Sequence, residues 1–152
     1  MTFDSEKLLD DTGWQLIQAL QDDARLSFAE LGRRVGLSPP AVAERVRRME
    51  EAGIITGYRV EINPGKSGLP LMALIGLTTT PQQYPEVIAL INNLPEVLEC
   101  HHVTGNYSFV IKAIASSMSH LEALIGKLSR YGQTSTSLVL SRTKSYQGLR
   151  RL

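Results

Sequence analysis

The sequence predicts an α+β protein with a helix-turn-helix (winged-helix-like) domain, a linker strand and a ferredoxin-like βαββαβ domain. Three observations support this prediction. Two helix start signals lie close together between Ser27 and Ile55, a β-rich run follows and closes at Asn63-Pro64-Gly65, and strand and helix patterns alternate from Leu69 onward. The 152 residues, 43% of them apolar, can bury one ordinary core or two small ones. We expect three parts, at residues 1–54 (helix-turn-helix), 55–68 (linker strand and hinge) and 69–152 (ferredoxin-like, oligomerising domain).

The first helix is expected from Thr12 to Asp22, with Asp11 or Thr12 as its N-cap. Its apolar face repeats at helical spacing through Leu16, Ile17 and Leu20. Gly13 costs up to about 1 kcal/mol relative to Ala inside a helix, so we expect this end either to fray or to pack unusually closely.

Two further helices form the helix-turn-helix. Ser27 and Glu30 have the spacing of a capping box, and Gly36 can take the left-handed conformation that ends this helix. Ser38 is a good N-cap and Pro39 suits the first helical position, so a new helix begins after a short turn.

The last of these helices separates an apolar stripe from a polar outer side. The stripe consists of Val42, Val46 and Met49, spaced to face a small core. The outer side carries Pro40, Ala43, Glu44, Arg47, Arg48 and Glu51. Two interpretations fit this pattern: a recognition helix for the major groove of DNA, or a solvated amphipathic helix whose arginines only confer solubility.

In the DNA-binding interpretation, Arg47 can form a fork with guanine and Glu44 can accept from cytosine N4. Arg45 lies near the edge of the apolar stripe, where its stem can cover apolar surface. Arg33, Arg34 and Arg48 are placed to contact DNA phosphates. The candidate DNA-binding residues are Arg33, Arg34, Ser38, Pro39, Pro40, Ala43, Glu44, Arg47 and Arg48.

Charge supports this interpretation only locally, because the whole chain has a net charge of +1. From Arg25 to Arg59 there are seven Lys and Arg against four Asp and Glu, whereas the preceding segment is acidic. This excess predicts modest non-specific affinity for nucleic acid, and specific binding would need several copies acting together.

The linker strand is expected after Gly53. Tyr58, Val60 and Ile62 alternate with charged residues in this stretch, as in a half-buried strand. A lone strand leaves its edges unpaired, so we expect it to pair with its twin in a second subunit.

The C-terminal pattern gives four strands and two helices. The expected order is strand Leu71 to Thr79, helix Tyr84 to Leu94, strand Val97 to Val103, strand Tyr107 to Ala115, helix Ser119 to Arg130 and strand Ser135 to Lys144. Both helices of a ferredoxin-like unit cover one face of its antiparallel sheet. The strands LMALIGL and FVIKAIA are apolar on both sides, so we expect the other face to be covered by dimerisation, sheet against sheet.

No motif of an enzyme is present. The sequence has neither a serine nucleophile elbow nor a dinucleotide fingerprint. Gly65-Lys66-Ser67 matches the end of a P-loop, but Val60 stands where its first Gly must be and no helix follows. We therefore expect no enzymatic activity and no cofactor.

Metal-ligand residue types gather only at Cys100, His101, His102 and His120. Along a strand Cys100 and His102 share a face and His101 points away, so a third ligand would have to come from His120 on a helix. Paired Cys or His-x-x-x-His spacing is absent, which favours ordinary structural roles and no metal site.

Cysteine content and apolar patterning indicate the compartment. The single cysteine excludes an intramolecular disulfide and fits a reducing cytosol. The first nine residues are polar and acidic rather than a signal peptide, and the longest apolar runs are too short to span a bilayer. We expect a cytoplasmic protein that is not bound to a membrane.

The turn VTGNYS offers a further candidate site. Thr104-Gly105-Asn106 presents a hydroxyl, an amide and open backbone donors between two strands. Such a concave polar site can hold a small zwitterion, but the same residues also suit an ordinary hairpin turn.

The N-terminal half resembles that of the Lrp/AsnC (leucine-responsive and asparagine-responsive, or feast/famine) regulators over DDARLSFAELGRRVGLSPPAVAERVRRMEEAGIITGYRVEINP. A second resemblance follows at the expected distance, over PEVLECHHVTGNYSFVIKA. The resemblance implies a DNA-binding helix-turn-helix, a linker strand and a C-terminal domain that dimerises and can assemble into rings of dimers.

The resemblance also implies an amino-acid effector site at this turn, between dimers. Most members have Asp where Ser108 stands, and GNYS is similar to the version in the asparagine-responsive branch. Glu is common where Ser135 stands, so two partners for a ligand's ammonium group are missing and the ligand or its pose is expected to differ. The candidate effector-binding residues are His102, Thr104, Gly105, Asn106, Tyr107, Ser108, Thr134 and Thr136.

Two hypotheses follow. The first is a sequence-specific DNA-binding transcriptional regulator whose oligomerisation and DNA binding respond to a small amino-acid-like ligand. Its expected partners are double-stranded DNA, this effector and further copies of the chain, as a homodimer assembling into higher even oligomers. The alternative is a ligand-sensing accessory module that acts by protein contact, with the helical half used only for assembly.

Overall fold

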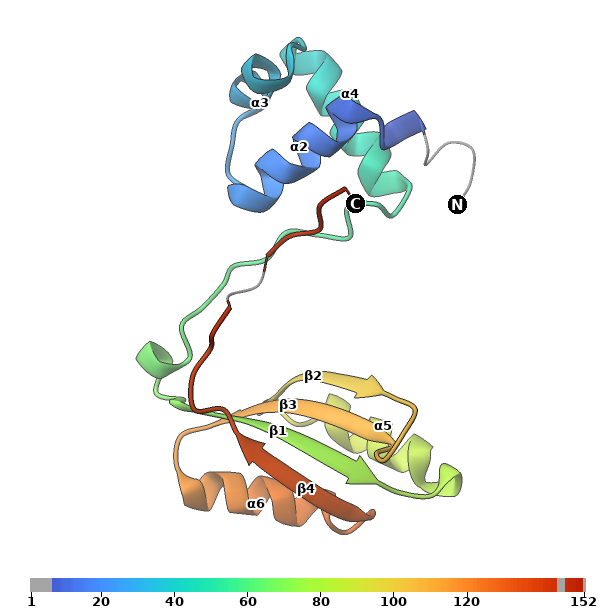
Figure 1. Cartoon of the computed structure of the whole chain (residues 1–152), viewed down its shortest axis with the longest axis vertical. Coiled ribbons are helices and arrows are strands. Elements are labelled where there is room, and N and C mark those ends of the chain that lie inside the picture. Colours follow the sequence, from blue (N-terminus) through green and yellow to red (C-terminus); the bar gives the residue numbers. More distant parts are fainter. Residues whose placement is uncertain (1–6, 145–146, 152) are drawn as a thin grey trace. The chain divides into compact units, whose positions relative to one another are not determined.

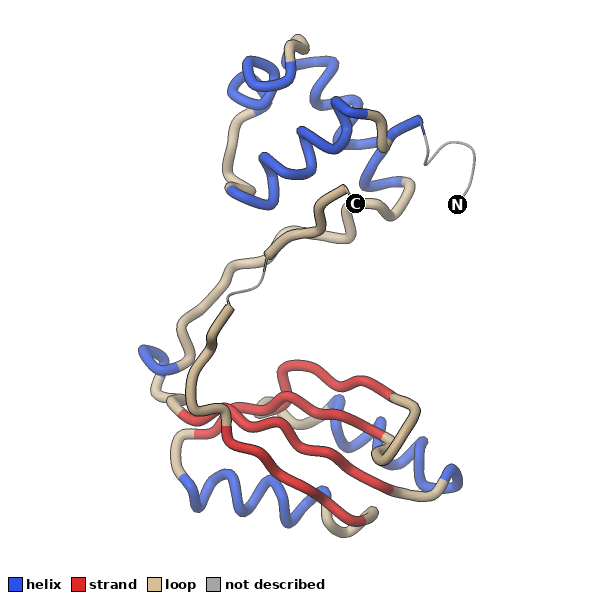
Figure 2. Tube along the Cα trace, viewed as in Figure 1, coloured by secondary structure: helices blue, strands red, loops and turns tan. Residues whose placement is uncertain are grey.

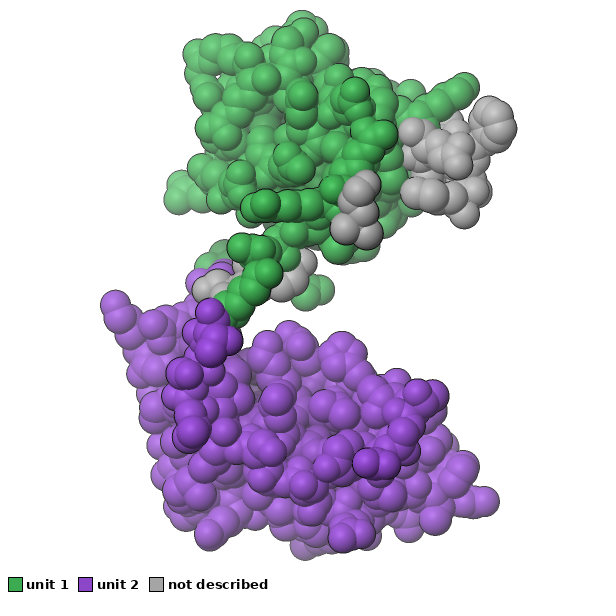
Figure 3. Space-filling model, in the orientation of Figure 1, with its two compact units in different colours: residues 1–60, 144–152 green, residues 61–143 purple. Residues whose placement is uncertain are grey.

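The computed structural model describes residues 7–144 and 147–151. The chain forms two compact units, a helical unit of Met1–Val60 with Lys144–Leu152 and an α/β unit of Glu61–Thr143 (Figure 3). The described residues after Thr143 thus group with the helical unit, although the sequence suggested a domain of residues 69–152. Each unit has a separate hydrophobic core.

The helical unit contains α2 (Asp11–Asp22), α3 (Phe28–Val35) and α4 (Pro39–Glu51) (Figure 1). Both caps expected for the helix-turn-helix are present: the Ser27 hydroxyl accepts from the Glu30 N–H, and the Ser38 hydroxyl accepts from the Ala41 N–H. The N-cap of α2 is Asp10 rather than Asp11 or Thr12, because the Asp10 carboxylate accepts from the Gly13 N–H at 2.8 Å. The buried core residues are Leu16, Ala19, Leu31, Val42 and Val46.

Two glycines of this unit allow close backbone contacts. A Cβ on Gly13 would lie 1.9 Å from the Leu8 carbonyl oxygen, so this end of α2 packs closely instead of fraying. A Cβ on Gly32 would lie 2.3 Å from the carbonyl oxygen of Leu37, whose N–H donates to Gly32 O. The tight turn between α3 and α4 therefore requires the small residue at position 32.

The expected linker strand is not formed in this chain. Residues 55–64 carry no strand, and no described segment of the chain forms a ladder with them. A strand exists only with a partner, so the expected pairing of this linker with its twin in a second subunit stays a prediction. A short 3₁₀ helix, Gly65–Ser67, precedes the first strand of the α/β unit.

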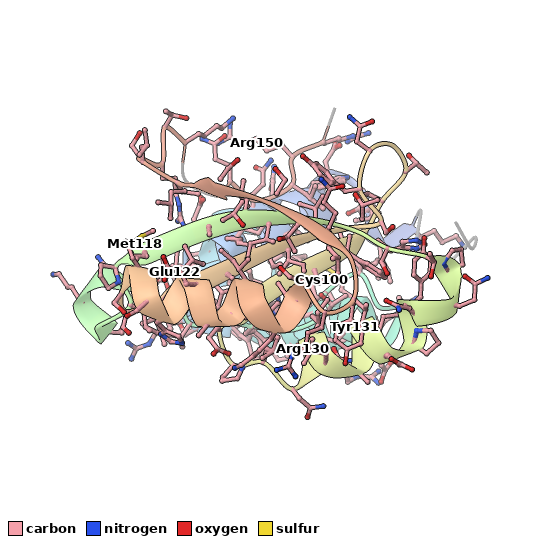
Figure 4. All side chains as sticks on the ribbon, turned by 90° about the horizontal axis from the view of Figure 1, so that it is seen from below. Cys100, Met118, Glu122, Arg130, Tyr131 and Arg150 are labelled. Atoms are coloured by element: carbon pink, nitrogen blue, oxygen red, sulfur yellow. The ribbon has the colours of Figure 1, made fainter. Side chains whose placement is uncertain are left out.

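The α/β unit has the predicted βαββαβ order. Its elements are β1 (Leu71–Thr78), a 3₁₀ turn (Pro81–Gln83), α5 (Tyr84–Asn92), β2 (Val97–His102), β3 (Phe109–Ala115), α6 (Met118–Leu128) and β4 (Gln133–Leu138). The sheet is antiparallel in the order β2-β3-β1-β4. Both helices cover one face of it (Figures 1 and 2), and they lie in front of the sheet when seen from below (Figure 4).

One strand differs clearly from its expected range. β4 begins at Gln133 and ends at Leu138, whereas the sequence suggested Ser135 to Lys144. Leu138 pairs with Ala73, and the Val139 N–H donates to the Met72 carbonyl oxygen. Past this point β1 is near its first residue, Leu71, so the chain has little strand left to pair with.

The two faces of the sheet differ in burial. Ala73, Ile75 and Leu77 of β1 are at most 1% exposed beneath the helices. On the other side, which we call the open face, Leu74 of β1 is 44% exposed. The open face also carries Met72, Gly76, Glu99, His101, Val110, Lys112 and Ile114, as strand alternation and register require.

Candidate DNA-binding and effector sites

The outer side of α4 has the orientation that the sequence predicts. Val42, Val46 and Met49 are buried against the helical core, at 3% exposure or less. Their opposite side presents Arg47 and Glu44 to solvent, with Ala43 half-buried between the two sides. The other candidate residues are all exposed: Arg33, Arg34, Ser38, Pro39, Pro40 and Arg48.

The arginine in the middle of this surface is held by two carboxylates of its own helix. Arg47 donates to Glu44 through Nε at 3.0 Å and through Nη2 at 2.7 Å, and it also pairs with Glu51. The Glu44 carboxylate raises the pKa of Arg47, and Arg47 lowers the pKa of Glu44. The ion pair between Arg47 and Glu44 must open before either side chain contacts a base. Opening it costs little because exposed ion pairs are weak.

The candidate phosphate contacts of α3 show the same arrangement. Arg33 and Arg34 both pair with Glu30, the latter at 3.3 Å. Hydrogen bonds from Arg33 and then Arg34 lower the pKa of Glu30. DNA phosphates would therefore compete with a local carboxylate for these two arginines.

Arg45 has a structural role beyond covering apolar surface. Its Nη2 atom lies 2.6 Å from the Asp10 carboxylate and 3.5 Å from the Lys7 carbonyl oxygen. The hydrogen bond from Arg45, followed by that from the Gly13 N–H, lowers the pKa of Asp10. Arg45 thus connects α4 to the N-cap of α2 and helps fix the orientation of α4.

A groove beside α4 contains residues that the sequence did not indicate. Phe28 and Tyr58 are 44% and 50% exposed at its walls. The Tyr58 hydroxyl donates to Glu50 at 2.9 Å, and burial together with Glu50 raises the pKa of Tyr58 to about 12. The groove is lined by Leu20, Ala24, Leu26, Phe28, Ala43, Val46, Arg47, Glu50 and Tyr58.

The candidate effector turn joins β2 to β3. Gly105 has a φ of 109°, a conformation that other L-residues rarely adopt, and a Cβ on it would meet no atom within 4 Å. The Thr78 hydroxyl donates to the Asn106 carbonyl oxygen at 2.9 Å. The turn is therefore fixed to the end of β1 while the space beside Gly105 and Thr104 stays open.

The Ser108 hydroxyl makes two hydrogen bonds within the fold. Its hydroxyl accepts from the Thr79 N–H at 3.1 Å and donates to the Thr79 carbonyl oxygen at 3.0 Å. An aspartate could accept the first bond, but its ionised carboxylate has no hydrogen for the second. We therefore interpret Ser108 as a clamp on the end of β1, and the missing carboxylate there has a structural explanation.

The aromatic side chains near this turn lie on opposite faces of the sheet. The Tyr107 ring packs on Gly76, where a Cβ would lie 2.6 Å from the ring carbons. His102 faces the helix side, with its ring centroid 4.9 Å from that of Tyr84 and 5.1 Å from that of Phe109. A ligand bound at the open face can therefore contact Tyr107 but not His102.

The two candidate threonines of β4 lie one strand away from the turn. Thr134 pairs with Leu77 and Thr136 with Ile75, so both point to the helix side. The Thr134 hydroxyl is 3.2 Å from that of Ser129. Ser135 pairs with Gly76 and so shares the open face with Tyr107.

The metal-ligand residue types do not converge. Cys100 packs against the core on the helix side (Figure 4), and burial raises the pKa of its thiol. His120 Nε2 lies 3.2 Å from Glu96, and its Nδ1 lies 3.1 Å from the Ser116 hydroxyl. Residues 7–144 and 147–151 contain no group of three His, Cys, Asp or Glu placed to hold a metal ion. In the same ranges, every helix is too short or too polar to cross a membrane.

Comparison with known proteins identifies the family. Residues 9–50 match the AsnC-type helix-turn-helix domain, and residues 72–149 match the Lrp/AsnC ligand binding domain. This chain belongs to the Lrp/AsnC family. Its relatives in this family are transcriptional regulators, which confirms the prediction of a DNA-binding regulator rather than an enzyme.

Individual Lrp/AsnC proteins resemble the chain over nearly its whole length. The transcriptional regulator LrpC of Bacillus subtilis is 36% identical over 140 residues, which are 92% of this chain and 97% of LrpC. A Neisseria meningitidis regulator in complex with L-Met is 30% identical, with a TM-score of 0.87 and 93% and 96% of the two chains covered. The feast or famine regulatory protein of Mycobacterium tuberculosis complexed with L-methionine is 32% identical, with a TM-score of 0.88 and coverage of 94% and 99%.

Within this Lrp/AsnC chain, sequence reasoning missed Gly76 and Gly32. Gly76 stands in the apolar run LMALIGL, and a glycine inside a strand is a signal for close approach by another group. Gly32 lies inside a short helix, where a glycine that costs helix stability usually has a packing reason. Both signals were available, but neither names the residue that approaches.

Proposed function

We propose that this chain reads the major groove of double-stranded DNA with α4 and that a small amino-acid-type effector at the α/β unit modulates this binding. The observation that carries the proposal is the outward position of Arg47 on a capped helix that follows a tight turn. In this geometry the outward side of a recognition helix enters the major groove. The protein would act in the cytoplasm.

Each candidate residue has a stated role in this proposal. Arg47 forms a fork with guanine and Glu44 accepts from cytosine N4, after their mutual pair opens. Arg33, Arg34 and Arg48 bind phosphates. Ser38, Pro39, Pro40 and Ala43 form the small N-terminal part of the helix that approaches the groove closely.

The effector would bind beside Thr104, Gly105, Asn106 and Tyr107. Open backbone at a turn can hold the carboxylate or ammonium group of a zwitterion. Two relatives are described as complexes with L-methionine, so this amino acid is the first ligand to test. We assign the hydroxyl of Ser108 to the fold, while His102, Thr134 and Thr136 would act indirectly from the helix side of the sheet.

Assembly into dimers or higher even oligomers completes the proposal. Leu74 on the open face is 44% exposed, and Val60 and Ile62 of the linker are 86% and 67% exposed. Burying apolar area of this kind in a second copy is favourable by about 25 cal/mol per Å². Several copies would also raise DNA affinity above that of a single, weakly basic helical unit.

The test combines DNA binding with ligand stabilisation of the purified protein. We expect an operator fragment to bind more tightly than random DNA, with an affinity that falls as salt rises. L-Methionine is tested first and the other amino acids after it. A ligand that binds should raise the melting temperature, and at 100 times its dissociation constant it should add about 2.7 kcal/mol to the free energy of unfolding. An intact oligomer with no affinity for DNA at low salt would instead support the accessory-module alternative.

A further inference from the structure

The end of the chain packs on α2 of the helical unit. Gln21 Nε2 donates to the Leu149 carbonyl oxygen at 3.1 Å, and Arg151 pairs with Asp11. Gly148 lies so close to α2 that a Cβ on it would be 1.8 Å from the Gln21 side-chain oxygen. These contacts involve both ends of α2, and Figure 1 shows the last described residues (red) beside the helical unit.

Charge complementarity favours this packing. Residues 1–60 contain eight Lys and Arg against ten Asp and Glu, a balance of −2. Residues 144–152 add three cations and no acid, which brings the helical unit to +1. The acidic residues stand in pairs at the two ends of α2: Asp10, Asp11, Asp22 and Asp23.

The same segment is continuous with β4. Just after β4 the Val139 N–H donates to the Met72 carbonyl oxygen, and Arg142 Nη1 lies 3.3 Å from Glu61 at the start of the α/β unit. The chain therefore passes between the two units twice, after Val60 and after Thr143. The chain that leaves β4 of the α/β unit thus continues to the residues that dock on α2 of the helical unit.

We propose that the segment around Gly148, Leu149 and Arg151 acts as a second tether, which restrains the helical unit and transmits the state of the α/β unit to it. Two connections leave a unit fewer orientations than one, so the second tether changes how readily several helical units fit one DNA site. An effector that alters β4 would then alter DNA affinity through this segment, a step that rests on the proposed function.

The test compares the intact chain with a chain that stops after Thr143. Amide hydrogen exchange in α2 should become faster in the truncated protein, because the docked segment no longer covers it. Operator affinity without ligand should change several-fold. If L-methionine changes operator affinity of the intact protein by about fivefold or more, this ratio should fall toward one after truncation, with unchanged thermal stabilisation by L-methionine.

A matched pair of variants separates the effect of losing the docking contact from the effect of losing a positive charge. Arg151→Gln and Arg150→Gln each remove one positive charge, but only Arg151 faces Asp11. Within the described part of the chain, Arg150 has no ion pair (Figure 4 labels its position). We expect faster exchange in α2 for Arg151→Gln and intact behaviour for Arg150→Gln.

The possible outcomes decide between the proposals. Unchanged exchange in α2 after truncation would overturn the docking, and unchanged operator affinity and ligand response despite faster exchange would overturn the coupling. If the intact protein shows no response to any amino acid, the proposed effector fails, and operator affinity of the truncated protein still tests the tether. Equal operator affinity in that case contradicts the tether, and a several-fold change supports it.

Discussion

The DNA-binding surface and the effector turn differ in how their side chains are used. On α4 the side chains of Arg47 and Glu44 project into solvent, and the hydrogen bonds between them stay within that helix. At the turn the polar groups bind residues distant in sequence, as Ser108 does with Thr79. A surface built by local rules can be predicted from spacing, whereas a turn built by pairing across strands cannot.

The largest expected effects separate the two units. Leu31→Ala in the helical core and Leu124→Ala under the sheet each remove a side chain with 0% exposure, so each should cost about 2–5 kcal/mol in its own unit. Calorimetry should show that Leu31→Ala lowers the melting temperature of the helical unit and that Leu124→Ala lowers that of the α/β unit. Loss of both transitions together in either variant would mean that the units do not have separate cores.

A smaller effect is expected at the position under Tyr107. Gly76→Ala forces the Tyr107 ring off the open face and should cost about 1–3 kcal/mol, measured by denaturant unfolding. Gly126→Ala in α6 is the control, since its Cβ would meet nothing within 4 Å and alanine favours a helix. Equal stability of the two variants would show that Tyr107 does not pack on Gly76.

The hydroxyl of Ser108 provides a test of the clamp at the turn. Ser108→Ala leaves the Thr79 N–H and carbonyl oxygen without their partner, so it should cost about 1–3 kcal/mol. Ser108→Asp keeps an acceptor for the N–H and loses the donor, so a smaller loss is expected. If both variants are as stable as the parent, the hydroxyl is free for a ligand and our interpretation of Ser108 is wrong.

The smallest effect concerns Asp10 and pH. Its pKa is lowered in the folded protein by Arg45 and then by the Gly13 N–H, so its contribution to stability is present above the unfolded pKa of 3.8. As pH falls through the lower folded pKa, the contribution is lost. In Asp10→Asn the free energy of unfolding of the helical unit should therefore fall less steeply as the pH is lowered. An unchanged fall would mean that other carboxylates cause the acid sensitivity.

The sequence predicted the fold well where signals are local. Ser27, Ser38 and Pro39 begin their helices as expected because capping depends on neighbouring residues. Strand ends were less accurate, because β4 stops at Leu138 where its partner β1 runs out. Arg45 and Gly148 were beyond prediction, since their partners, Asp10 before α2 and Gln21 on α2, are brought close only by the folded chain.

Paired variants of two arginines measure most directly whether α4 reads bases. Arg47→Ala should weaken binding to the operator roughly ten- to hundredfold and leave binding to random DNA nearly unchanged, because a base contact carries sequence information. Arg33→Ala, the phosphate control on α3, should weaken both by a similar factor and lower the salt dependence of binding. Equal losses on operator and random DNA for Arg47→Ala would contradict the account.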